Sequence, residues 1–122
     1  MMAINELTPE QLFAGLYADT NIENEPMSGG RQMGGHFVTE SHNSNGSWKT
    51  LMDQKNHSSD ISPTAGQIPR LVGLAQASKV YRALNIEGSE RFSNKGNEVA
   101  WGTIGNASTS EGLFLEAINA AG

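Results

Sequence analysis

Three stretches of the chain combine small residues with side chains that can do chemistry. The first, GGRQMGGHF (residues 29–37), sets Arg31, Met33 and His36 among four glycines. An arginine can hold a carboxylate or phosphate through two hydrogen bonds. A histidine titrates near neutral pH and can act as an acid, a base or a substrate-binding group. Each also has an ordinary explanation, a structural ion pair for Arg31 and a solvated surface position for His36.

The second stretch is the turn GTIGNASTSEG (residues 102–112). Gly105, Ala107 and Ser108 are small enough to let the backbone approach an anion, and the amide oxygen of Asn106 can ligate a hard cation such as Mg²⁺. A helix after this turn would offer free N–H groups and a positive dipole end, which favour phosphate. An ordinary strand-to-helix turn explains the same residues equally well. The motifs of a P-loop and of a dinucleotide-binding loop are absent.

The third stretch is ISPTAGQIP (residues 61–69). Ser62 and Thr64 either begin a helix or form a backbone edge on which a heterocycle docks. The histidines His42 and His57 lie in polar segments without regularly spaced partners. A zinc site built from histidines is therefore not expected.

The elements that position these stretches follow from their apolar spacing. The segment LTPEQLFAGLYAD (7–19) predicts a helix, with Thr8 as its cap, Pro9 at the first position and Gln11 completing a capping box. A second helix is expected within 62–84. Its true start should lie near Ala65 or Gly66, because Pro69 fits only the first turn.

The remaining elements are a strand, a last helix and a long loop. EVAWGTI (98–104) is too apolar to face water and predicts a buried parallel strand. A helix should follow over 109–122. Residues 21–61 are expected to form a long loop rich in Gly, Ser and Asn, with HFVTE (36–40) as a short strand. Low apolar content favours disorder over 40–50.

The order of these elements predicts an α/β fold. A lone parallel-type strand cannot form a sheet by itself. We therefore expect residues 1–122 to be a single partial domain, a fragment of a parallel sheet flanked by helices.

Composition excludes several function classes. The net charge is -5, the 8 Lys and Arg residues are scattered, and there is no cysteine. These features argue against nucleic-acid binding, membrane-surface binding and thiolate chemistry. No apolar run is long enough to span a bilayer, and the amino-terminal residues do not form a signal peptide. A cytoplasmic location is expected.

Taken together in this order, the three stretches resemble the α-subunit of the thiamine-diphosphate-dependent first component of 2-oxoacid dehydrogenase complexes. The matching residues are Gly30, Arg31, Gln32, Met33 and His36 in the first stretch, Ser62, Pro63, Gln67, Ile68 and Pro69 in the second, and Gly105, Ser110, Glu111 and Gly112 in the third. The first stretch is closer to the branched-chain members, which act on 2-oxoisovalerate, than to the pyruvate members.

The resemblance implies a role for each matching position. Met33 and His36 would line the substrate pocket, with His36 as a catalytic residue. The backbone around Ser62 and Thr64 would hold the aminopyrimidine ring of thiamine diphosphate. Residues 105–108 (Gly105, Asn106, Ala107 and Ser108) would approach the diphosphate, with Asn106 on Mg²⁺. The full enzyme would decarboxylate a 2-oxoacid oxidatively and pass the acyl group to a lipoyl group.

The resemblance has departures and gaps. Asn106 stands where the family usually has an acid, and Ala107 replaces a glycine. The family's remaining cofactor contacts have no counterpart in these 122 residues, so the isolated fragment is expected to be inactive. The implied partners are a β subunit or β portion and a lipoyl-bearing acyltransferase, in a homo- or hetero-oligomer. The alternative is a non-catalytic anion-binding or assembly domain, and an unrelated nucleotide-binding α/β piece is a third.

Overall fold

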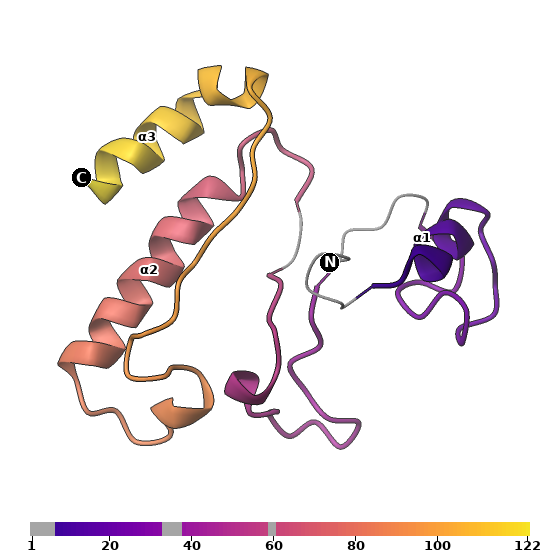
Figure 1. The fold of residues 1–122 in the computed structure, drawn as a ribbon, viewed down its shortest axis with the longest axis horizontal. Helices are drawn as coiled ribbons and strands as arrows, with labels where there is room; N and C mark the ends of the chain where they lie inside the picture. The colour runs from indigo at the N-terminus through magenta and orange to yellow at the C-terminus, as the bar shows by residue number, and fades with distance from the viewer. Residues whose placement is uncertain (1–6, 33–37, 59–60) are drawn as a thin grey trace. The chain divides into compact units, whose positions relative to one another are not determined.

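A computed structural model describes residues 7–32, 38–58 and 61–122 (Figure 1). The chain divides into two compact units. Unit 1 consists of Met1–Glu40 and Lys55–Asp60, and unit 2 of Ser41–Gln54 and Ile61–Gly122. The α-helices are α1 (Pro9–Leu16), α2 (Ile68–Ala83) and α3 (Gly112–Ala121), and the short 3-10 helices are η2 (Leu51–Asp53), η3 (Ser89–Arg91) and η4 (Ala107–Ser110). None of the helices in these described residues is long and apolar enough to cross a membrane.

Helix α1 of unit 1 begins as its sequence predicts. The Thr8 side chain accepts a hydrogen bond from the Gln11 N–H at 3.2 Å, and the Gln11 side chain accepts one from the Thr8 N–H at 2.9 Å. This reciprocal capping box, with Pro9 in the first turn, confirms the expected start. The helix ends at Leu16, earlier than the expected end near Asp19. Ala18 has a φ of 55°, a left-handed conformation that cannot continue the helix.

Helices α2 and α3 pack against each other in unit 2. Helix α2 begins at Ile68 with a proline in its first turn, as predicted, but two or three residues later than expected. The delay has a local cause, because Ala65 has a φ of 61° and lies outside the helical region. Helix α3 buries Ala117, which is 4% exposed, and lies within the helix predicted for 109–122.

The predicted parallel-sheet α/β fold is wrong for the described residues. They are 40% helical with 2% strand content and contain no sheet. Their β-bridge is a single isolated antiparallel one between His42 and Trp48. Residues 98–104, expected as a buried strand, run alongside α2 without a strand partner (Figure 1). Two of their large side chains are exposed, Val99 by 81% and Trp101 by 66%.

The physical reason is that the described residues contain no second strand with which this segment could pair. A strand is stable only within a sheet or against a packed layer. The other segment with strand character, 36–40, begins in residues outside the described part, and its described residues 38–40 form no strand. The prediction of a buried parallel strand at residues 98–104 is therefore wrong.

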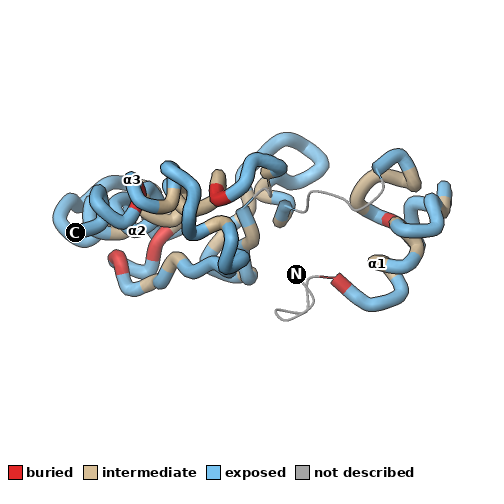
Figure 2. The backbone as a smooth tube through the Cα atoms, turned by 90° about the horizontal axis from the view of Figure 1, so that it is seen from above, coloured by how far each residue is buried: buried red, intermediate tan, exposed pale blue. Residues whose placement is uncertain are grey.

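Few apolar side chains are buried in either unit. Among the described residues they are Leu7, Ala65 and Ala117. The buried segments of the tube, red in Figure 2, are short and scattered. Polar contacts therefore contribute much of the local order. Two of the buried residues are polar, Glu25 at 3% exposed and Ser93 at 5%.

A carboxylate ties the segment after α2 back onto that helix. Glu98 accepts hydrogen bonds from the hydroxyls of Ser78 (2.8 Å) and Ser93 (2.6 Å) and from the Asn94 N–H (3.0 Å). Burial opposes ionisation of Glu98, but these donors outweigh it and lower the pKa to about 2. We call this arrangement the Glu98 clip. It fixes the start of the extended segment that leads to the turn at 105–108.

Aromatic contacts order the turn at 41–49, which the sequence predicted to be disordered. The rings of His42 and Trp48 lie 4.0 Å apart between centroids, and Phe92 meets Trp48 edge-on at 5.7 Å. The Asn43 N–H and the Lys49 N–H bond across the turn to the carbonyls of Ser47 and Ser41. The polar composition of this segment gave no indication of the cluster, because Trp48 is the one large apolar residue within the turn.

Candidate functional site

Two segments of unit 2 that are distant in sequence line one shallow cavity of about 210 Å³. One wall is the loop before α2 and the other is the segment that enters η4. We call the cavity the loop–turn pocket. Its lining residues are Ile61, Ser62, Pro63, Thr64, Ala65, Gln67, Ile68, Thr103, Ile104, Gly105 and Ser108. In Figure 1 both segments lie at the amino-terminal end of α2.

The loop before α2 is held in shape by its own contacts. The Gln67 side chain donates to the Ile61 carbonyl at 3.1 Å, and the Gly66 N–H donates to the Pro63 carbonyl at 3.0 Å. Ala65 is only 6% exposed. A side chain at Gly66 would come within 2.5 Å of the end of the Ile61 side chain and 3.0 Å of the Pro63 carbonyl oxygen, so its neighbours would have to shift. This wall of the pocket is therefore folded before any ligand arrives.

The turn at 105–108 uses its own backbone donors. The Ala107 N–H donates to the Asn106 side-chain oxygen at 2.9 Å, and the Ser108 N–H donates to the Gly105 carbonyl at 3.0 Å. The Thr109 N–H and hydroxyl both donate to the Asn106 carbonyl, at 3.2 and 2.6 Å. An anion cradle needs backbone N–H groups directed at the ligand. In this structure these donors are directed into the turn itself.

The structure brings together some of the residues predicted to bind the cofactor. Ser62 and Thr64 share the pocket lining with Gly105 and Ser108. Asn106 and Ala107 belong to the same turn but are not part of the lining. The sequence did not assign a role to other lining residues, Gln67, Ile68, Thr103 and Ile104. Gln67 and Ile68 do match the family's second motif, so the sequence could have assigned them to this site.

The predicted substrate-binding residues Met33 and His36 lie outside the described residues. The segment that leads to them is part of unit 1 and is organised by Glu25. The Glu25 carboxylate accepts hydrogen bonds from the N–H groups of Met27, Ser28 and Gly30, each at 2.9 Å, and from the Ser28 hydroxyl at 2.6 Å. Ser28 makes the largest contribution to lowering the pKa of Glu25 to about 2.

Residues 25–30 therefore resemble an anion-binding loop that is filled by its own carboxylate. Gly30 has a φ of 74°, and a side chain there would come within 2.6 Å of the Ala18 carbonyl oxygen. The glycines of this region thus serve close backbone packing at Gly30. They are no sign of a ligand at that position.

The residues present do not complete a Mg²⁺–thiamine diphosphate site. Mg²⁺ takes six oxygen ligands in near-octahedral geometry. No group of three or more His, Asp or Glu able to hold a metal occurs among residues 7–32, 38–58 and 61–122. The Asn106 amide oxygen, the predicted ligand, already accepts from the turn. The cavity is also smaller than the range of about 300–1,000 Å³ typical of small-molecule sites.

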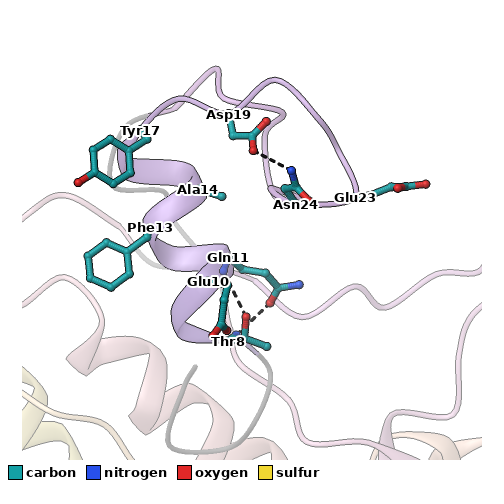
Figure 3. Close-up of a pocket in the computed structure, with 9 residues that line it drawn as sticks. All are labelled: Thr8, Glu10, Gln11, Phe13, Ala14, Tyr17, Asp19, Glu23 and Asn24. Atoms are coloured by element: carbon teal, nitrogen blue, oxygen red, sulfur yellow. Dashed lines mark hydrogen bonds between the residues drawn. The ribbon is translucent and has the colours of Figure 1, made fainter.

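A larger hollow of about 490 Å³ lies along α1 in unit 1. Figure 3 shows the rings of Phe13 and Tyr17 on one side of the helix, whereas Asp19 and Asn24 pair with each other on the other side. Hydrogen bonds from the Asn21 N–H and then from Asn24 lower the pKa of Asp19. The polar groups of this hollow do not converge, so it is not a candidate site.

Comparison of the chain with protein-family models, with curated proteins and with solved structures finds no match.

Proposed function

We propose that this chain forms part of the cofactor-binding region of a thiamine-diphosphate-dependent 2-oxoacid dehydrogenase, with the loop–turn pocket as the wall that meets the aminopyrimidine end of the cofactor. The observation that carries the proposal is the shared lining of the pocket by Ser62 and Thr64 from one motif and Gly105 and Ser108 from another. The resemblance requires these motifs to meet at one ligand, although about forty residues separate them.

The polar groups that line the pocket suit the aminopyrimidine end of thiamine diphosphate better than its diphosphate end. Hydroxyl and amide side chains and backbone carbonyls can bond a neutral, planar ring edge. The donors of the turn at 105–108 are bonded within the turn, which disfavours a diphosphate in this conformation. The proposal therefore assigns the Mg²⁺ ligands and the remaining contacts to parts of the enzyme outside these 122 residues, with a β subunit or β portion as a partner. The 2-oxoacid substrate and the lipoyl-bearing acyltransferase belong to that assembled enzyme.

The test is an amide-resolved NMR titration of the chain with thiamine diphosphate, with and without Mg²⁺. The proposal expects weak, millimolar binding with shifts at residues 61–68 and 103–108, and little dependence on Mg²⁺. Ser108→Ala should reduce those shifts, whereas Ser110→Ala, outside the pocket lining, should leave them unchanged. Shifts confined to other residues, or none at millimolar ligand, would show the proposal to be wrong.

The neutral side chain of Asn106 favours a second function, a non-catalytic domain, which could bind a simple anion only after the turn at 105–108 rearranges. Its amide oxygen caps the turn and carries no negative charge for a metal. Inorganic pyrophosphate separates the two functions in the same titration. Equal shifts with pyrophosphate and with thiamine diphosphate support the anion-binding domain. Shifts with thiamine itself, which lacks phosphate, support the cofactor wall.

A further inference from the structure

Residues 99–104, which we call the open strand, form an extended apolar segment with no charged side chain. Val, Ile, Thr and Trp are the residue types that favour strands. Val99 is 81% exposed and Trp101 is 66% exposed. These exposures are large for apolar side chains that lie two positions apart on one face of an extended segment.

The backbone of the open strand is unpaired within the described residues. None of its N–H or C=O groups takes part in a hydrogen bond with another described residue. Backbone polar groups need partners, and a strand with free edges is a template for pairing with another chain. Edge strands are commonly protected by Lys, Pro or a bulge, and the sequence VAWGTI contains neither residue.

One face of the open strand lies against α2, which holds the strand in position for pairing. Gly102 lies against Leu71 of α2, because a side chain at this glycine would come within 2.9 Å of a Leu71 methyl group. Alternation along a strand then directs Val99 and Trp101 to the opposite face. The Glu98 clip holds one end of the open strand and the turn at 105–108 follows the other. Little conformational entropy remains to be lost when a second strand pairs with it.

The distribution of charge indicates which partner fits. Unit 1 contains seven of the acidic residues and two of the basic ones, whereas unit 2 contains six of each. Two copies of unit 2 therefore approach without net repulsion. The acidic side chain nearest the open strand, Glu98, is bonded to two serine hydroxyls and so is partly shielded.

We propose that the open strand pairs antiparallel with the same segment of a second copy of this chain, about a two-fold axis at Trp101. In this register Val99 faces Thr103 and Ala100 faces Gly102 of the other copy. The two Trp101 rings meet, a cross-strand aromatic contact that adds to the main-chain hydrogen bonds. Both α2 helices then cover the same face of the two-stranded ribbon, which gives it the packed layer that an isolated hairpin lacks. The proposal is independent of any ligand.

The first experiment is sedimentation equilibrium across a concentration series. The wild-type chain should show a reversible monomer–dimer equilibrium. The double variant Val99→Lys, Trp101→Lys should be monomeric at every concentration at which the wild type dimerises, because four like charges then meet in the ribbon. The matched control is Tyr17→Lys, Ile22→Lys in unit 1, with side chains 83% and 66% exposed. It adds the same charge and should still dimerise.

The second experiment is amide hydrogen exchange on the wild-type chain, which does not depend on any variant folding. Every second amide of residues 99–104 should gain protection as protein concentration rises, as an antiparallel pair requires. A wild type that stays monomeric overturns the proposal. So does a dimer that survives the lysines at 99 and 101 or is lost in the unit 1 control. Protection that does not change with concentration would mean that another part of the same chain covers the strand.

Discussion

Residues 93–98 and residues 99–104 follow each other in the sequence, but only the first segment is held by hydrogen bonds to other described residues. In the first segment one carboxylate, Glu98, collects donors from Ser78, Ser93 and Asn94. In the second, no backbone group bonds to another described residue. In this part of the chain, a carboxylate with several donors fixes the loop, whereas the apolar residues that follow have no hydrogen-bonded partner among the described residues.

Removal of the Glu25 carboxylate should cause the largest loss of stability, because this carboxylate holds the loop at residues 25–30. Glu25→Ala removes the acceptor of four hydrogen bonds in a site that is 3% exposed. We expect unit 1 to lose about 3 kcal/mol of stability, because several donors are left unpaired. Amide exchange of residues 25–30 measures the loss. The control Glu23→Ala, an exposed position, should change stability by less than about 0.5 kcal/mol; equal effects would contradict the account.

A methyl group at Gly96 should break the Glu98 clip. Gly96 has a φ of 73°, and a side chain there would collide with the Ser78 carbonyl oxygen and approach the Arg82 side chain within 2.8 Å. Gly96→Ala should therefore cost about 2 kcal/mol or more. Gly88 has a similar φ of 81° with no atom within 4 Å. Gly88→Ala should cost only the backbone term, about 1 kcal/mol. Urea unfolding of both variants gives the comparison, and equal midpoints would argue against the collision.

Acid should loosen both carboxylate-held loops. The pKa values of Glu25 and Glu98 are lowered from 4.5 to about 2 in the folded chain. The folded state therefore binds fewer protons than the unfolded state between these values, and stability falls as the pH falls. The contribution is complete above about pH 4.5 and is lost towards pH 2. Allowing for nearby solvent, we expect about 1–2 kcal/mol for each group. Stability measured against pH should lose the Glu25 share of this slope in Glu25→Gln and keep the Glu98 share.

The smallest effect is expected at Asn106, which caps a turn through one hydrogen bond. Asn106→Asp keeps an oxygen acceptor for the Ala107 N–H. Asn and Asp cap about equally well, so thermal unfolding should change by less than about 0.5 kcal/mol. The substitution also restores the charge usual in the family that the chain resembles. If Mg²⁺ then raises thiamine diphosphate affinity in the NMR titration, position 106 can reach the metal. If affinity stays unchanged, Asn106 has only its capping role.

The sequence predicted those features that depend on neighbouring residues. Thr8, Pro9 and Gln11 lie within one turn and fix the start of α1, and Pro69 fixes the first turn of α2. Ser62 and Thr64 line one pocket with Gly105 and Ser108, but the cofactor contacts that the resemblance implies for them stay a prediction. The features that failed depend on distant partners. The apolar residues within 98–104 predict an extended strand, but they do not show whether a second strand is present to pair with it. The left-handed Ala65, which delays α2, has no local signal at all.

The aromatic cluster of the turn at 41–49 has a consequence for spectroscopy. Both tryptophans belong to unit 2, and they report different environments. Trp48 is 50% exposed and contacts the rings of His42 and Phe92, whereas Trp101 is 66% exposed. Unit 1 has a single fluorescent residue of moderate yield, Tyr17. Tryptophan emission therefore reports on unit 2 alone, and the contacts of Trp48 with two other rings distinguish its component from that of Trp101.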